Sequence, residues 1–168
     1  QIDLDFSVEV ITVINASIHS SDEIKKLNEE NFNDGINWTS TANSDKLKFH
    51  FILKNDLPHK HAGVGLARKI GMDEAVFRFH QIGFDGIIVC ADADALYEID
   101  FLKKVHDHFF IHHPKTTGCS IYFEHPLSGN EFDEKVYDAI LRYELFLRYY
   151  KNVLAWCGFP FAFHTIGS

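Results

Sequence analysis

Cysteine is scarce in this sequence, and the few residues present are poorly arranged for disulfides or zinc. There are three in 168 residues, Cys90, Cys119 and Cys157, far apart and in apolar surroundings. A disulfide framework needs an even number, and a zinc site needs closely spaced ligands, so the pattern predicts neither. It favours reduced thiols in the core and therefore a reducing compartment, the cytoplasm.

Basic residues are also in short supply. The chain has 16 Lys and Arg against 24 Asp and Glu, which gives a formal net charge of −8. General nucleic-acid binders and proteins that bind anionic membranes present a basic face, so this balance argues against both classes. Any phosphate group must therefore be bound by a local site.

Long apolar runs are missing as well. The longest late stretch, residues 153–163, is interrupted by Gly158 and Pro160. It is shorter than the ~20 residues that a membrane-spanning helix needs. We therefore predict no membrane span in this chain, and we find no signal-peptide pattern at its start.

Apolar side chains are nevertheless abundant, at 46% of the 168 residues. This is enough for a substantial core, so we assign residues 1–168 to a single domain. The chain begins at Gln1 rather than Met and stops at Ser168 without a polar tail. We therefore expect it to be a fragment of a longer protein.

The first part of the chain predicts a strand, a helix and a second strand. Residues 8–14 are rich in β-branched side chains and 47–53 alternate apolar with polar, which is typical of strands. Residues 20–23 form a capping box, and the Asn-Asp-Gly at 33–35 predicts the end of the helix. Residues 38–45, rich in Ser, Thr and Asn, predict a surface loop.

A strand-to-helix junction follows, with Gly63 and Gly65 at the start of the predicted helix and Arg68 and Lys69 close behind. Glycines let the backbone approach a ligand, and a helix N-terminus favours an anion. Arg68 stands where a dinucleotide fingerprint needs a third small residue, and the Gly-Lys-Ser/Thr of a phosphate loop is missing, so both of those sites are excluded. The alternative is that the glycines simply pack the helix against the sheet.

The segment 86–95 combines a short apolar run with two carboxylates. Residues 87–90, Ile-Ile-Val-Cys, predict a strand buried on both faces of a largely parallel sheet. If the extended geometry continues, Asp92 and Asp94 point the same way, and two like charges need a cation. Ligands of such sheets bind beyond the carboxyl ends of strands, so we expect a metal–phosphate site here. The alternative is a solvated acidic turn.

The second half of the chain predicts further helices and strands. Residues 100–110 and 132–150 have helical periodicity, the latter with a wide apolar face that we expect in the core. Residues 118–123 and 156–165 predict strands, the last containing His164, and His125 begins a loop. The histidines near the end of the first helix lack the spacing of a zinc site: His106, His108, His112 and His113.

The order of these motifs resembles the inverting glycosyltransferases of family two. The matching features are a strand with a polar end, a helix opened by Gly-x-Gly-x-Ala-Arg at Gly63 to Arg68, and an apolar strand that ends in Asp92-Ala-Asp94. Residues 143–150 and 158–168 resemble a bacterial subgroup of these enzymes. The resemblance implies a GT-A fold, which is a Rossmann-like, mainly parallel mixed sheet between helices in three α/β/α layers. Lys69 departs from the family, which has Asn there.

The resemblance also implies a role for each motif residue. A nucleotide-diphosphate sugar would be the donor, with Asp92 near the ribose and the metal, and Asp94 as a ligand of Mg²⁺ or Mn²⁺. Arg68 would contact the nucleotide beside the glycine turn, and Asn15 would face the base, where the family usually has Asp. His125 and His164 are candidates for the donor or acceptor pocket. The acceptor would be a hydroxyl of a glycan, a lipid or another molecule.

The general base of the family follows the last element present here, so we expect it beyond Ser168. We also expect the family's first strand to be missing, and the fragment to be inactive alone. Two alternatives remain. A sugar-nucleotidyltransferase would carry Gly-Thr-Arg after its first strand, unlike Gly65-Leu-Ala-Arg68. A glycosyltransferase-like module could bind a partner or glycan without turnover.

Overall fold

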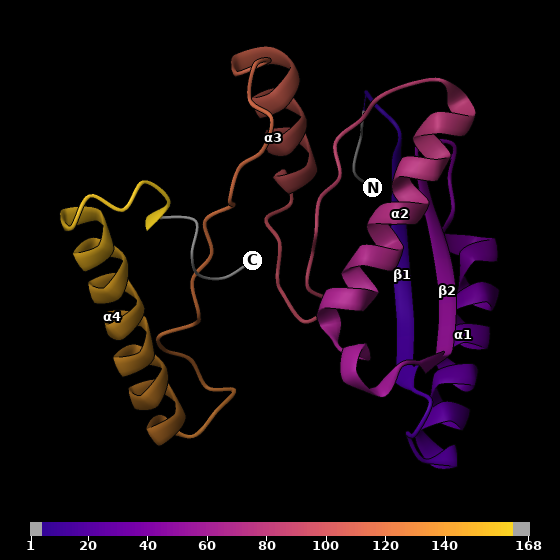
Figure 1. Cartoon of the computed structure of the whole chain (residues 1–168), viewed down its shortest axis with the longest axis horizontal. Helices are drawn as coiled ribbons and strands as arrows, with labels where there is room; N and C mark the ends of the chain where they lie inside the picture. Colours follow the sequence, from indigo (N-terminus) through magenta and orange to yellow (C-terminus); the bar gives the residue numbers. More distant parts are fainter. Residues whose placement is uncertain (1–4, 163–168) are drawn as a thin grey trace. The chain divides into compact units, whose positions relative to one another are not determined.

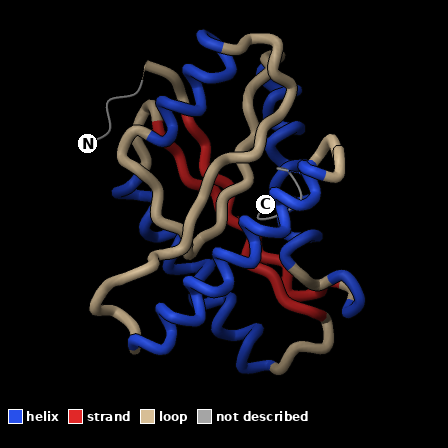
Figure 2. The backbone as a smooth tube through the Cα atoms, turned by 90° about the vertical axis from the view of Figure 1, so that its left-hand side faces the viewer, coloured by secondary structure: helices blue, strands red, loops and turns tan. Residues whose placement is uncertain are grey.

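The computed structural model describes residues 5–162, which fall into two compact units that divide after His112. The described chain is a mixed α/β protein with a two-stranded parallel sheet and four α-helices. Figure 2 distinguishes these helices and strands from the long loops that join the later helices. The α/β class predicted from the sequence is thus confirmed, and the assignment of the whole chain to one domain stays a prediction.

The first unit is built on a β-α-β motif (Figure 1). Strand β1 (Val8–Ser17) leads through helix α1 (Asp22–Ala42) to strand β2 (Leu47–Leu57), and the two strands pair in parallel. Both predicted strands are confirmed, and each extends further toward its carboxyl end than its apolar pattern indicated. The most buried residues of this unit, Ala16 and Leu57, lie near those carboxyl ends, at 5% and 6% exposure.

Helix α1 is longer than the sequence indicated. The Ser21 hydroxyl accepts the Ile24 amide at 3.4 Å and caps the start, but the predicted stop at residues 33–35 is wrong. A Cβ on Gly35 would lie 2.6 Å from the Phe51 ring, so this glycine permits close helix–strand packing inside the helix. Packing therefore outweighs the low helix propensity of Gly, and part of the predicted loop at 38–45 is helical.

Helices α1 and α2 (Val64–Ile82) cover opposite faces of the sheet (Figure 1). Phe49 of β2 lies edge-on against Trp38 of α1, with ring centroids 4.6 Å apart, whereas the next residue, His50, contacts Arg78 of α2. Successive strand residues point to opposite faces, so this alternation separates the two helices.

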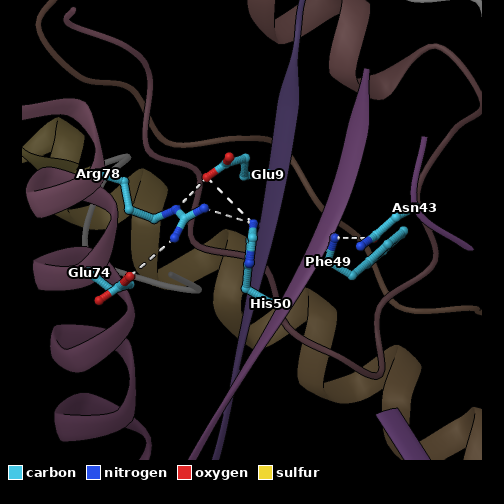
Figure 3. A network of polar contacts seen from close by, with 6 residues as sticks. All are labelled: Glu9, Asn43, Phe49, His50, Glu74 and Arg78. Atoms are coloured by element: carbon cyan, nitrogen blue, oxygen red, sulfur yellow. Dashed lines mark hydrogen bonds and ion pairs between the residues drawn. The ribbon is translucent and has the colours of Figure 1, made fainter. Parts of the chain in front are cut away.

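A charged network joins α2 to both strands (Figure 3). Arg78 donates to Glu9 of β1, lies 3.4 Å from Glu74 on its own helix, and has its Nη2 3.0 Å from Nε2 of His50. The hydrogen bond from Arg78 holds the pKa of Glu9 below its usual range. Since these side chains are about one-third exposed, the network contributes modestly to stability.

The predicted strands at 87–90 and 118–123 are wrong: neither run forms strand pairing within the described residues. Ile88 is 38% exposed and Cys90 is also exposed, so the first run is not buried on both faces. A β-branched run becomes a strand only when a neighbouring strand pairs with its backbone, and β1 and β2 pair only with each other. Cys90, Cys119 and Cys157 are free but exposed, which corrects their predicted place in the core.

Helix α3 (Phe101–Asp107) and the π-helical turn His108–His112 match the helix predicted at 100–110. In the second unit, helix α4 (Glu134–Trp156) buries Tyr137, Glu144 and Leu147. Tyr143 and Phe146 of the predicted apolar face are instead 51% and 63% exposed.

The strand predicted at 156–165 is wrong at its start. Trp156 ends α4, and a turn with Gly158 at φ +78° follows, while residues beyond 162 lie outside the described part. Within residues 5–162, no helix combines the length and apolar character needed to cross a membrane.

Candidate functional site

The carboxyl end of β1 meets the start of α2. The side-chain amide of Asn15 donates to the carbonyl oxygen of Ala62 at 3.3 Å, and Ala62 directly precedes Gly63, the N-cap of α2. The Ser17 hydroxyl lies 3.3 Å from Nδ1 of His59 in the same connection. Asn15 therefore lies beside the helix N-terminus, at the edge of the sheet where the sequence predicted a ligand.

Gly63 and Gly65 face open space. A Cβ built on either residue has no neighbouring atom within 4 Å, so neither glycine is needed to pack α2 against the sheet. Gly71, further along the helix, is the glycine that approaches the sheet, with its added Cβ 3.5 Å from Val13. Gly63 has φ −107° and ψ −176°, an extended conformation open to any residue. The packing explanation for these two glycines is therefore contradicted, and the space beside them is free for a ligand.

Arg68 and Asp92 come together across 24 residues of sequence. Arg68 Nη2 donates to a carboxylate oxygen of Asp92 in an ion pair whose side chains are 28% and 58% exposed. The Tyr97 hydroxyl donates to the backbone carbonyl of Asp92 at 3.0 Å. An ion pair this exposed contributes little to folding, about 0–1 kcal/mol. The two halves of the predicted site are thus adjacent without a strong structural reason.

Asp92 and Asp94 do not share an extended strand. The Ala95 amide donates to the Asp92 carbonyl at 3.3 Å, which closes a turn through residues 93 and 94. The predicted alignment of the two carboxylates by strand alternation is therefore wrong, and the segment forms the exposed acidic turn that was the alternative. Asp94 is exposed and forms no hydrogen bond or ion pair with other described residues, whereas Asp92 is partly engaged by Arg68.

Two further histidines were singled out by sequence. His125, in the second unit, is held by the buried Glu144: its Nδ1 lies 2.6 Å from Oε1, and its backbone amide donates to the same oxygen at 3.3 Å. These contacts, chiefly the imidazole hydrogen bond, hold the pKa of Glu144 below its usual range. The Nδ1 atom of His125 thus anchors the loop that contains this histidine to α4. His164 lies outside the described residues.

Sequence reasoning missed the residues that support the site. Tyr97 follows the carboxylates closely enough to have been noticed as a turn partner. Asn28 and Asn55 connect α1 to β2 at 2.9 Å, beside Asn15, but isolated asparagines carry no distinctive sequence signal. In the second unit, the partner of His125 was missed as well: Glu144 is an acidic residue within a helix rich in aromatic side chains, and that contrast could have marked it as buried and paired.

The arrangement mixes groups that bind anions with groups that bind cations. A helix N-terminus, Arg68 and the Asn15 amide favour phosphate and polar ligands, while Asp92 and Asp94 supply carboxylate oxygens. Within residues 5–162, no cluster of three or more His, Cys, Asp or Glu side chains forms a complete metal cage. No protein-family model, curated protein or solved structure matches this chain.

Proposed function

We propose that this chain is the donor-binding part of an inverting, metal-dependent glycosyltransferase that uses a nucleotide-diphosphate sugar. The single observation that carries the proposal is the contact between Arg68 and Asp92. It joins two of the motifs on which the family resemblance depends. The same proposal includes a GT-A-like fold with three α/β/α layers and a cytoplasmic location.

The nucleotide would bind along the start of α2. The amides of the first helical turn and the Arg68 guanidinium attract the diphosphate, and the space beside Gly63 and Gly65 admits it close to the backbone. Asn15, whose amide already lies beside Ala62, would contact the base. The Asn carboxamide has a donor and an acceptor, so it suits a nucleobase edge.

The carboxylates fit a divalent metal. Mg²⁺ is commonly held by one or two carboxylates together with substrate phosphates, so Asp92 and Asp94 need no third protein ligand. Asp94 is the stronger candidate because Asp92 already pairs with Arg68. Mg²⁺ or Mn²⁺ would supply Lewis-acid neutralisation of the charge that develops on the leaving diphosphate.

The transfer itself needs a base for the acceptor hydroxyl, which attacks the anomeric carbon as the nucleoside diphosphate leaves with the bonding electrons. The proposal assigns that role to no described residue. The acceptor would be a glycan, a lipid or another hydroxyl compound, and His125 and His164 stay candidates for the donor or acceptor pocket.

The test is an assay of nucleoside diphosphate release from UDP-, GDP- and dTDP-sugars by the full-length gene product, with and without Mn²⁺. Metal-dependent release from one of these donors is the expected result. Release of pyrophosphate from a sugar phosphate and a nucleoside triphosphate would favour a nucleotidyltransferase instead. Absence of metal-dependent release and of nucleotide binding would refute the proposal.

A further inference from the structure

The sheet is irregular where β1 approaches the candidate site. The parallel register is regular from Val8 to Asn15, where Asn15 pairs with Lys54, but the next pair joins Ser17 to Leu57. Two residues of β2, Asn55 and Asp56, therefore oppose the single residue Ala16. This is the arrangement of a β-bulge, a feature that is frequent next to active sites because it redirects a side chain.

One side chain spans this bulge. The Nδ2 of Asn28, on α1, lies 3.3 Å from the carbonyl oxygen of Asn15 and 2.9 Å from Oδ1 of Asn55. Asn55 in turn donates to the Lys25 carbonyl on α1 at 3.0 Å. All three asparagines are partly buried. The two hydrogens of a single carboxamide thus join both strands to the helix at the bulge.

We infer that Asn28 is a positioning residue for nucleotide selectivity. The Asn28 side chain donates to the backbone carbonyl of Asn15, and the side-chain amide of Asn15 donates to the carbonyl of Ala62, just before α2. The Asn15 carboxamide is the group that would contact the base, so its aim depends on Asn28 and on the bulge that Asn28 stabilises. This inference rests on the proposed function.

A direct comparison uses the same chemical change on either side of one hydrogen bond. Asn28→Asp removes both donated hydrogens and places carboxylate oxygens against two acceptors. Asn55→Asp keeps an acceptor for Asn28 and loses only the bond to Lys25. Both changes are nearly isosteric, so packing is preserved. Ser21→Ala serves as a stability control, because it removes the N-cap hydrogen bond of the same helix and none of the hydrogen bonds at the bulge.

The measurement is the dissociation constant of UDP, GDP and dTDP with Mn²⁺ by calorimetry on the full-length protein, together with the melting temperature. We expect Asn28→Asp to weaken binding of the preferred nucleotide about 5- to 20-fold, which corresponds to the loss of one or two hydrogen bonds. We also expect the differences in affinity among the three nucleotides to become smaller. Asn55→Asp and Ser21→Ala should retain the preference of the unsubstituted protein.

An unchanged preference in Asn28→Asp, with nucleotide binding intact, would overturn the positioning role alone. If Ser21→Ala also reduced the differences in affinity among the three nucleotides, the positioning role would be overturned too, because the loss of selectivity would then result from lower overall stability. Failure of the unsubstituted protein to bind any of the three nucleotides would overturn the proposed function, and this inference with it. Should Asn28→Asp not fold, Asn28→Ala carries the same expectation.

Discussion

Replacing Arg68 by Ala separates a binding role from a structural one. The Arg68–Asp92 pair is 28% and 58% exposed, so its loss should cost the fold no more than about 1 kcal/mol. A hydrogen bond to a charged group is worth ~1.5–3 kcal/mol, so the same change should weaken nucleotide binding about 10- to 150-fold. The two effects differ enough to be told apart.

The assay pairs calorimetric titration of a nucleoside diphosphate in Mn²⁺ with denaturant unfolding. Lys69→Ala is the matched control, since Lys69 is the next residue on α2 and pairs with Asp73 four residues on, with both side chains more than 60% exposed. We expect this variant to lose at most ~0.5 kcal/mol of stability and to bind nucleotide normally.

Two results would refute the reasoning. Loss of folding in Arg68→Ala would show that the residue is structural, contrary to its exposure. Equal nucleotide affinity in Arg68→Ala, Lys69→Ala and the unsubstituted protein would show that Arg68 does not contact the ligand.

Three more changes are informative. Asp94→Ala should abolish Mn²⁺-dependent nucleotide binding, because it removes the more available carboxylate from the metal, and an unchanged calorimetric affinity would contradict the metal assignment. Gly65→Ala should raise the free energy of unfolding by roughly 0.5 kcal/mol yet weaken nucleotide binding, because its methyl group enters open space beside the helix start. Gly71→Ala, in the same helix but against Val13, is its control and should bind normally. Glu144→Gln should cost about 1 kcal/mol near neutral pH, the difference between a charged and a neutral hydrogen bond.

The Glu144 variant also changes the pH dependence of stability. The pKa of Glu144 is lower in the folded protein than its unfolded value of about 4.3, so the unfolded state binds the proton more readily. The stabilisation is therefore present above that pH and is lost as the pH falls through the folded pKa. Urea unfolding from about pH 3 to 7 should show a steeper acid loss in the unsubstituted protein than in Glu144→Gln. Parallel profiles would contradict the role of the His125 contact.

Local patterns predicted the elements whose stability is mainly local. The strands of the β-α-β motif, the start of α2 after Gly63 and most of α4 follow from β-branched runs, capping residues and helical periodicity, which act over a few residues. The same patterns marked Arg68 and Asp92, because glycine turns and paired carboxylates carry a chemical signal without any partner, whereas Asn15 was indicated only by the family resemblance. Asn28 and Asn55, which support the site, carried no such signal.

Tertiary contacts decided the rest. Close packing against the Phe51 ring accounts for Gly35 inside a helix rather than at its end. Residues 87–90 are irregular because no strand among the described residues pairs with them. The ion pair between Arg68 and Asp92 joins residues 24 positions apart, and the Asn28 bridge across the bulge joins residues 13 and 27 positions apart. Sequence alone therefore identified Arg68, Asp92 and Asp94 as candidate ligand-binding groups, and the folded chain decided which of them meet, because closure over long loops depends on packing that no local pattern encodes.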